Sequence, residues 1–314
     1  MLRAWKRRSC AQKNDIMRSF GEKERSCETT FQNCLPCWHT YTSGKETPVI
    51  FVNDNDMALV MNIIAQAAYL FTGKVFIIAF VVMNNHLHFV LSGDAHLVNE
   101  MMSFILKRIN RAFGLSKTLS FTSKSIEDVQ SMRNHIVYVH RNGYVANHNY
   151  TPFSYPWGSG AYYFMPERSG MKFFDISSIE NRSMFRSRDV KLPPDWQVLD
   201  GHIAPPSFCA IELGMSMFRD AHHYFSMVSK NVEAYSSIAV DLDDEEFLTD
   251  QELFSQLQKT AREQYRLGSL RDLSNAQKLD LARTLHYDYR SSNGQIRRVL
   301  GLNQYDVDQL FKVR

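Results

Sequence analysis

The feature that most constrains this chain is a long apolar run that ends in two histidines separated by one residue. Residues 76–83 read FIIAFVVM, and residues 84–91 continue as NNHLHFVL. Successive side chains of a strand point to opposite faces, so His86 and His88 share one face and Leu87 lies on the other. A strand this apolar is expected to be buried, where titratable rings are rare. The run therefore predicts a β-hairpin that presents a pair of imidazoles.

Two imidazoles on one strand supply half of a metal site. A divalent ion also needs a third protein group, a substrate oxygen or water. The alternative is a chance pair of histidines on a strand surface. The apolar sequence on both sides of the pair favours the metal site, with His86 and His88 as ligands.

A second group of polar residues lies downstream, in a predicted helix over residues 125–143. Ser125 precedes two acidic residues, which suits a helix N-terminus, and a glycine at the far end suits the stop. Asn134, Tyr138 and Asn142 are spaced i, i+4, i+8, so a phenol and two carboxamides share one face of this helix.

Tyr138 is a candidate nucleophile. A phenol has a reference pKa of about 10, so it attacks slowly near neutral pH unless a nearby metal or base favours the phenolate. A metal held by the histidine pair would supply that effect. The alternative is an ordinary half-buried tyrosine on a helix.

Four segments carry a resemblance to a known family. They are residues 37–42 (CWHTYT), 83–93 (MNNHLHFVLSG), 138–142 (YVHRN) and 155–160 (YPWGSG). In this order they resemble the successive signatures of the single-tyrosine HUH transposases, especially the REP-associated tyrosine transposase branch. The resemblance covers roughly residues 34–165, and four ordered signatures are more specific than any one of them.

The resemblance implies roles for individual residues. His86 and His88 fall on the family's metal ligands, and Tyr138 falls on its nucleophile. Asn142 falls where a polar side chain completes or orients the metal site. Many relatives read Asn-Pro at this point, whereas this chain reads Asn142-Gly143, a departure that concerns the exit from the helix. The family ion is Mg²⁺ or Mn²⁺, but imidazole suits Mn²⁺ or Zn²⁺ better, so the metal stays open.

The implied activity is that of a metal-dependent single-stranded DNA endonuclease and strand transferase. Such an enzyme forms a 5′-phosphotyrosine intermediate and leaves a free 3′-hydroxyl. The implied partner is single-stranded DNA, folded as a hairpin or at the ends of a repetitive element, bound by a monomer or a homodimer. One alternative is a non-catalytic DNA-binding regulator derived from such an enzyme. Another is a phosphodiesterase that uses water, but the His-x-Thr or His-x-Ser triplets of two-histidine phosphoesterases do not occur here.

The resemblance also implies an α+β fold, a ferredoxin-like βαββαβα catalytic domain with an antiparallel sheet. Hydrophobic periodicity agrees with this order of elements. The predicted elements are a strand over 38–42, a helix over 54–71, a hairpin of 75–83 with 86–91, a helix over 98–113 and an edge strand over 119–122 before the tyrosine helix.

Basic residues in two places are candidate DNA contacts. Lys107, Arg108 and Arg111 lie on the predicted helix 98–113, where they either track phosphates or form an ordinary solvated face. Near the C-terminus, Arg297, Arg298 and Gln304 are further candidates.

The C-terminal region has the periodicity of a helix-turn-helix. Ser274 is expected to cap a helix over 276–289, and shorter helices follow over 294–300 and 304–311. The last of these is the candidate recognition helix, although it is acidic. The alternative is a small all-α bundle that makes protein contacts.

The chain therefore divides into four predicted regions. Residues 1–33 form a basic arm without regular structure, residues 34–165 the catalytic domain, residues 166–269 a wing and linker of unclear role, and residues 270–314 the helical DNA-binding module. The net charge of +3 is too small to indicate nucleic-acid binding by itself.

Cysteine usage and hydropathy bear on location. Five cysteines, an odd number without a secretory signal, fit a reducing cytoplasm. No segment reaches the ~18 apolar residues of a membrane helix.

Cys34 and Cys37 have redox or zinc spacing but lack a matching second pair. His39, His135 and His140 are interpreted as structural or positioning residues.

Overall fold

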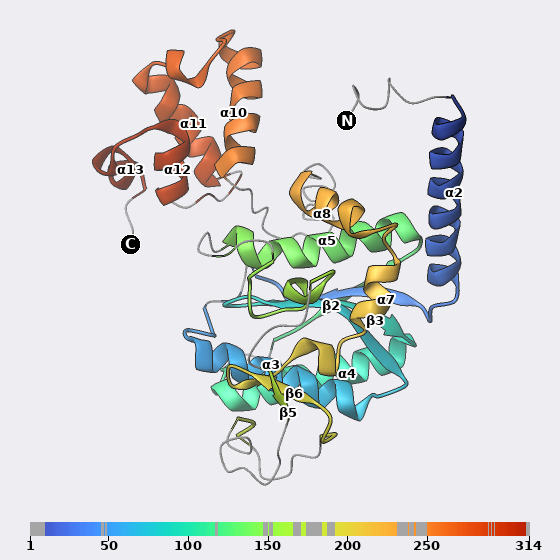
Figure 1. Ribbon diagram of the computed structural model, residues 1–314. Helices are drawn as coiled ribbons and strands as arrows, with labels where there is room; N and C mark the ends of the chain where they lie inside the picture. Colours follow the sequence, from blue (N-terminus) through green and yellow to red (C-terminus); the bar gives the residue numbers. More distant parts are fainter. Residues whose placement is uncertain are drawn as a thin grey trace. The chain divides into compact units, whose positions relative to one another are not determined.

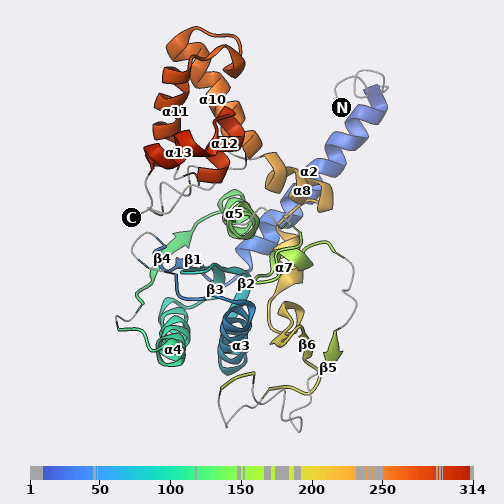
Figure 2. The ribbon, with the colours of Figure 1, turned by 90° about the vertical axis from the view of Figure 1, so that its left-hand side faces the viewer.

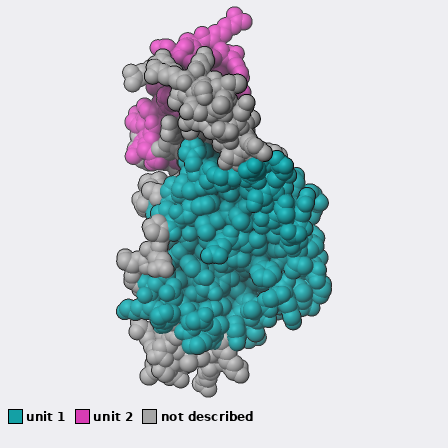
Figure 3. All heavy atoms as spheres, turned by 45° about the vertical axis from the view of Figure 1, so that its right-hand side comes forward, with its two compact units in different colours: residues 1–231 teal, residues 232–314 magenta. Residues whose placement is uncertain are grey.

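The computed structural model divides the chain into two compact units, Met1–Asn231 and Val232–Arg314, coloured separately in Figure 3. The fold of each unit follows from its own residues. The structure describes residues 10–44, 47, 49–116, 119–146, 150, 153–165, 171–173, 184–186, 192–230, 238, 242, 250–287, 289, 291 and 293–311.

The first unit is built on an antiparallel sheet of four strands in the order β2-β3-β1-β4. Along the chain the elements run β1, α3, β2, β3, α4, β4, α5, which confirms a mixed α and β fold with an antiparallel sheet. The strands are β1 (Cys37–Tyr41), β2 (Val75–Val82), β3 (Leu87–Gly93) and β4 (Thr122–Ile126).

Three helices cover the two faces of this sheet. Helices α3 (Asp54–Leu70) and α4 (Ala95–Phe113) lie on one face, and α5 (Val129–Ala146) lies on the other (Figure 1, Figure 2). Every residue of β3 is buried, as expected for a strand covered on both faces. Within the described part of the chain, none of the helices combines the length and the hydropathy that a membrane crossing requires.

The register between β1 and β3 fixes which side chains meet above the sheet. Tyr41 pairs with His88, and His39 pairs with Val90. Directly paired residues of antiparallel strands point to the same face, and residues two apart on one strand also share a face. His39, Tyr41 and His88 therefore face the same helix, α5.

The outer edge of β2 is covered by segments from later in the chain. The Val82 amide donates to the Trp157 carbonyl at 2.8 Å, and the Ala210 amide donates to the Ile77 carbonyl at 2.7 Å. An uncovered edge strand presents unpaired backbone groups to other chains. The segments around residues 158 and 209 therefore complete the sheet at this edge.

The region expected to be a wing packs onto α3. Strands β5 (Lys172–Phe173), β6 (Gln197–Leu199) and β7 (His202–Ile203) form a small antiparallel sheet. The side chain of Asn62, buried on α3, accepts the Ile203 amide at 2.8 Å. Ile203 also joins an apolar cluster with Ala65 of the same helix.

Two short helices complete the first unit. They are α7 (Ile211–Ser216) and α8 (Ala221–Lys230), and α8 packs on α5. The short 3-10 turns η1 (Gly160–Tyr162) and η2 (Pro205–Ser207) lie in the segments that cover β2.

The arm over residues 1–33 differs from the expectation. Residues 1–9 lie outside the described residues, but α2 (Cys10–Gln32) is a helix whose second half packs on α5 within the first unit. Its Glu24 accepts a hydrogen bond at 2.6 Å from Arg133 of α5, a guanidinium that is 1% exposed. Polar composition suggested a solvated segment, but a buried cation needs a partner and Glu24 supplies it.

The tyrosine helix also differs at both ends from the sequence prediction. It begins after Asp128, whose carboxylate accepts the Ser131 amide at 2.7 Å, because residues up to Ile126 belong to β4. It continues through Gly143 to Ala146. A Cβ at Gly143 would lie 2.3 Å from a ring carbon of Tyr155, so this glycine serves close packing and not helix termination.

The second unit is helical, as predicted. Ser274 caps α11, accepting the Gln277 amide at 3.3 Å while the Gln277 side chain accepts the Ser274 amide at 2.9 Å. Helix α10 packs against α12, so this unit begins upstream of residue 270. Its helices are α10 (Asp250–Tyr265), the turn η3 (Leu270–Asp272), α11 (Asn275–Tyr287), α12 (Asn293–Leu300) and α13 (Gln304–Leu310).

The contact between α2 and α5 can be tested by the substitution Glu24→Gln. Removing the carboxylate leaves the buried Arg133 without its anionic partner, so we expect the free energy of unfolding to fall by about 1–3 kcal/mol in urea titrations. Glu28→Gln, an exposed position on the same helix, is the control and should change stability little. Equal losses in both variants would contradict this role of Glu24.

Candidate histidine–tyrosine site

His86 is held by the hairpin turn between β2 and β3. The side-chain amide nitrogen of Asn85 donates to the carbonyls of Gly44 at 2.9 Å and Thr47 at 2.8 Å. This fixes the amide orientation and turns Asn85 Oδ1 toward His86 Nδ1, at 2.6 Å. An oxygen acceptor there requires the proton on Nδ1, so Nε2 of neutral His86 carries the lone pair.

Three buried histidines form a chain from β3 through β1 to α5. His88 Nδ1 lies 3.2 Å from His39 Nε2, and His39 Nδ1 lies 2.7 Å from His135 Nδ1. If His88 donates to His39 and His39 donates to His135, Nε2 of His88 is a lone-pair nitrogen. With this proton arrangement, both His86 and His88 would have the tautomer that a metal ligand needs.

Tyr138 lies directly against this chain of imidazoles. Its ring centroid is 5.5 Å from that of His88 and 5.7 Å from that of His39, in edge-on geometry. The tyrosine helix α5 and the histidine strand β3 therefore meet at Tyr138 and His88. Tyr138 and His88 are 0% exposed, and Asn142, one helical turn further along α5, is also 0% exposed.

Tyr41 forms one wall of the site. Its ring stacks on His88 with the two planes 13° apart and the centroids 5.9 Å apart. His86 and His88 approach edge to face, with centroids 5.0 Å apart. The site is thus a packed aromatic cluster at the interface between the sheet and α5.

The donor set fits a metal held by two imidazoles and completed by oxygen ligands. Nε2 is the available ligand nitrogen on both His86 and His88 in the arrangement above. Among the described residues, no group of three His, Cys, Asp or Glu side chains is placed to hold an ion. A metal here would therefore take its further ligands from an amide such as Asn142, from substrate or from water.

The candidate DNA-binding residues are placed elsewhere. Helix α4, which carries Lys107, Arg108 and Arg111, covers the face of the sheet opposite to α5, the helix of Tyr138 (Figure 2). Lys107 and Arg111 are exposed, whereas Arg108 donates to the Phe185 carbonyl at 3.4 Å. Burial, and secondarily the charge of Arg111, lowers the pKa of Arg108.

In the second unit, the two candidate arginines are exposed on α12. These are Arg297 and Arg298, which lie in the last turn of the predicted first helix of the helix-turn-helix. The side chain of Gln304 lies outside the described residues. Asn303, just before it, caps α13 by accepting the Asp306 amide at 2.8 Å.

His140 points away from Tyr138, as expected, and anchors α5 to neighbouring segments. Its Nε2 lies 2.8 Å from the Ser159 hydroxyl and its Nδ1 lies 3.0 Å from the Tyr224 hydroxyl. Ser159 in turn accepts the Phe80 amide at 2.9 Å. Burial lowers the pKa of His140 to about 3, so its ring is neutral at physiological pH.

Sequence reasoning underrated three residues of the site. His39 and His135 were interpreted as structural or positioning residues, and Asn85 fell between the two predicted strands of the hairpin. In the structure, His39 contacts His88, Asn85 contacts His86, and His135 contacts His39. The sequence did carry a signal for His39. Because His39 and Tyr41 are two residues apart on a predicted strand, they share one face of it. Nothing local to His135 identified its partner.

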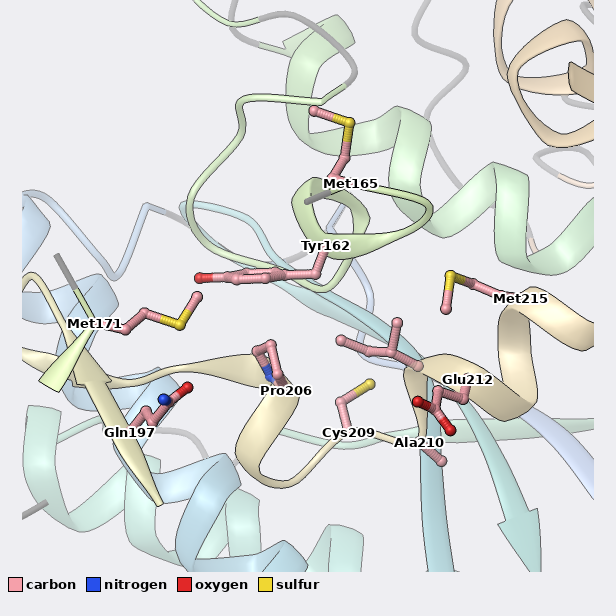
Figure 4. A pocket seen from close by; sticks show the side chains of 10 residues that line it. Tyr162, Met165, Met171, Gln197, Pro206, Cys209, Ala210, Glu212 and Met215 are labelled. Atoms are coloured by element: carbon pink, nitrogen blue, oxygen red, sulfur yellow. The ribbon is translucent and has the colours of Figure 1, made fainter. Parts of the chain in front are cut away.

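A separate pocket of about 470 Å³ opens between η1, β6 and α7. Figure 4 shows the ring of Tyr162 above Pro206, with the side chains of Gln197 and Glu212 on opposite sides. Its floor includes the buried Cys209. None of its lining residues belongs to the histidine–tyrosine site.

The buried state of His140 predicts a specific loss of stability in acid. The folded-state pKa is near 3 and the unfolded value is about 6.5, so the unfolded chain binds a proton first as pH falls through this window. Between pH 7 and pH 5, protonation of this histidine in the unfolded chain lowers the free energy of unfolding by about 2 kcal/mol. The variant His140→Gln should be less stable than the parent at pH 7 but lose correspondingly less between pH 7 and pH 5 in urea titrations. Parallel pH profiles for the two proteins would contradict this assignment.

Comparisons with known proteins show a weak structural likeness. No protein-family model matches the chain, and no curated protein matches it significantly in sequence. One solved structure, described as that of the REP-associated tyrosine transposase bound to a REP hairpin, aligns with 40% of this chain and 77% of its own. The identity is 14% and the TM-score is 0.30, a level that carries no conclusion about family or activity.

Proposed function

We propose that this chain is a metal-dependent single-stranded DNA endonuclease and strand transferase that forms a 5′-phosphotyrosine intermediate through Tyr138. The observation that carries the proposal is the contact of Tyr138 with the imidazole chain. Its ring lies 5.5 Å from the ring of His88, centroid to centroid, although the two residues are far apart in sequence. A tyrosine placed beside a pair of potential metal ligands has the partner that its activation requires.

The topology supports the proposal. The element order β1, α3, β2, β3, α4, β4, α5 and the strand order β4-β1-β3-β2 correspond to the ferredoxin-like arrangement that the sequence resemblance implies. In this arrangement the histidine strand is central and the tyrosine helix crosses one face.

His86 and His88 would hold the ion, through Nε2 of each ring, and Asn142 would supply or orient a further ligand. Mg²⁺ or Mn²⁺ is the proposed metal, and imidazole ligands favour Mn²⁺ of the two. When bound, the ion would polarise a phosphodiester oxygen and neutralise charge that develops in the transition state. His39 and Asn85 are positioning residues, because each contacts the Nδ1 atom of one ligand ring.

The covalent step uses the Tyr138 hydroxyl. The Oη atom loses its proton and attacks the phosphorus, a new P–O bond to tyrosine forms, and the bond to the 3′-oxygen breaks. The departing 3′-oxygen takes up a proton. Attack by another 3′-hydroxyl on the phosphotyrosine reverses the step and joins the strands without an external energy source.

DNA would be held by the exposed basic residues that lie outside the site. Arg297 and Arg298 on α12 are proposed phosphate contacts of a helix-turn-helix formed by α12 and α13. Lys107 and Arg111 on α4 are proposed as secondary phosphate contacts. These assignments concern affinity and predict a steep dependence of binding on salt.

A second candidate function is that of a DNA-binding regulator without cleavage activity. The burial of the site favours it, since Tyr138, His88 and Asn142 are all 0% exposed. A phosphodiester must reach the Tyr138 hydroxyl for the proposed chemistry, so an active enzyme has to open this cluster when DNA binds. A regulator has no such requirement.

The substitution Tyr138→Phe separates the two functions. It removes the attacking oxygen and keeps the ring, so we expect DNA binding to be retained and the covalent adduct to be abolished. The measurement is a denaturing gel of labelled hairpin-containing single strands incubated with protein and Mn²⁺ or Mg²⁺, beside a filter-binding assay.

Tyr163→Phe is the matched control. Tyr163 is an equally buried tyrosine outside the histidine–tyrosine site; its hydroxyl donates to the Ile78 carbonyl at 2.7 Å and its ring lies against His140. The control should lose about 1 kcal/mol of stability and keep the adduct. Cleavage that persists in Tyr138→Phe would disprove the nucleophile, and tight binding without any adduct in the parent protein would favour the regulator.

The proposed metal site can be tested without DNA. His86→Ala removes one of the two nitrogen ligands, so Mn²⁺ affinity, measured by the paramagnetic signal of free Mn²⁺, should fall at least about tenfold. His96→Ala, at an exposed position on α4, is the control and should leave affinity unchanged. Identical affinities for the parent protein and His86→Ala would rule out this site.

A further inference from the structure

Two cysteines flank the junction between α2 and the sheet. Cys34 follows the end of α2, and Cys37 is the first residue of β1. The two intervening residues, Leu35 and Pro36, are tied to the end of β3, where the Ser92 hydroxyl donates to the Leu35 carbonyl at 3.1 Å. The loop that separates the two sulfurs is therefore anchored to the sheet.

The two thiols lie within hydrogen-bonding reach of each other. In their neutral forms they also donate to nearby carbonyls, Cys34 to Thr30 at 3.4 Å and Cys37 to Leu35 at 3.3 Å. Cys37 is buried, whereas Cys34 is partly exposed and lines a cavity of about 330 Å³. A small reagent can therefore approach the first sulfur and not the second.

The environment makes the exposed sulfur the more acidic of the pair. A hydrogen bond from the Cys37 thiol lowers the pKa of Cys34 to about 7. The pKa of Cys37 is raised, first because its thiol donates that hydrogen bond and then because it is buried. At neutral pH a large fraction of Cys34 is thus thiolate, which is the reactive form.

We propose that Cys34 and Cys37 form a redox-active dithiol that exchanges with small-molecule disulfides. The Cys34 thiolate attacks one sulfur of the disulfide, forms a mixed disulfide and releases one thiolate. Cys37 then loses its proton and attacks the Cys34 sulfur, which forms the Cys34–Cys37 bond and releases the second thiol. The small disulfide is reduced by two electrons and the protein dithiol is oxidised by two.

A structural zinc site is the alternative function for two cysteines spaced like Cys34 and Cys37. Zinc needs four ligands, and among the described residues no third His, Cys, Asp or Glu is placed beside the pair. The internal bond would join the end of α2 to the strand that carries His39 and Tyr41. The proposal is independent of the DNA chemistry, because neither cysteine belongs to the histidine–tyrosine site.

The test uses the purified full-length protein and glutathione disulfide. The variant Cys37→Ser lacks the resolving thiol and should accumulate a glutathione adduct on Cys34, whereas the parent protein should pass to an internal disulfide. Chymotryptic cleavage after Phe31 and Trp38 releases both cysteines in one peptide, free of Cys27, so mass spectrometry distinguishes the two products.

The buried cysteines provide internal controls. Brief alkylation of the native reduced protein at pH 7 should modify Cys34 at least roughly tenfold faster than Cys27 or Cys209, both of which are buried. Cys34→Ser should abolish this fast phase. Equal rates at the three positions, or a parent protein that stays reduced while Cys37→Ser carries no adduct, would overturn the proposal. Retention of zinc that both serine variants lose would overturn it in favour of a metal site.

Discussion

The register of β1 against β3 is the constraint on which the candidate site depends. Pairing Tyr41 with His88 puts alternate side chains of both strands on one face, and α5 closes over them. A slip of β3 by one residue would turn His88 to the face of the sheet opposite to His39 and Tyr41. The two apolar helices on that other face make such a slip costly, because Leu87 and Phe89 would exchange places with polar neighbours. Burial of the apolar face thus specifies the geometry of the polar one.

The sequence predicted those parts of the fold that local periodicity determines. The apolar run predicted the hairpin of β2 and β3, and i, i+4 spacing put Tyr138 and Asn142 on one helix face. The contact of His39 with His135 was not predictable in this way, because it requires the strand register and the seating of α5 together. The packing of α2 was not predictable either. Its polar sequence gives little indication that its Glu24 pairs with the buried Arg133, 109 residues away. Tertiary electrostatics overrode composition there.

Buried polar groups in this molecule serve as connectors between segments that are distant in sequence. His140 joins α5 to the segment over β2 through Ser159 and to α8 through Tyr224. Asn62 joins α3 to the β6–β7 hairpin by two hydrogen bonds. Each group is expensive to bury and is compensated by specific partners, so each favours one arrangement of the segments over its alternatives. Apolar contacts alone would allow more than one packing arrangement of the same segments.

The covered edge of β2 has a consequence for how the molecule can be divided. The region of family resemblance ends near residue 165, but a fragment ending there would lack the Ala210 amide that pairs with Ile77. It would also uncover the apolar cluster that Ile203 completes on α3. Such a piece would carry every candidate catalytic residue and still present an open strand edge to its neighbours. The smallest self-sufficient fragment that carries the candidate site therefore extends to the end of α8, about sixty-five residues beyond the region of family resemblance.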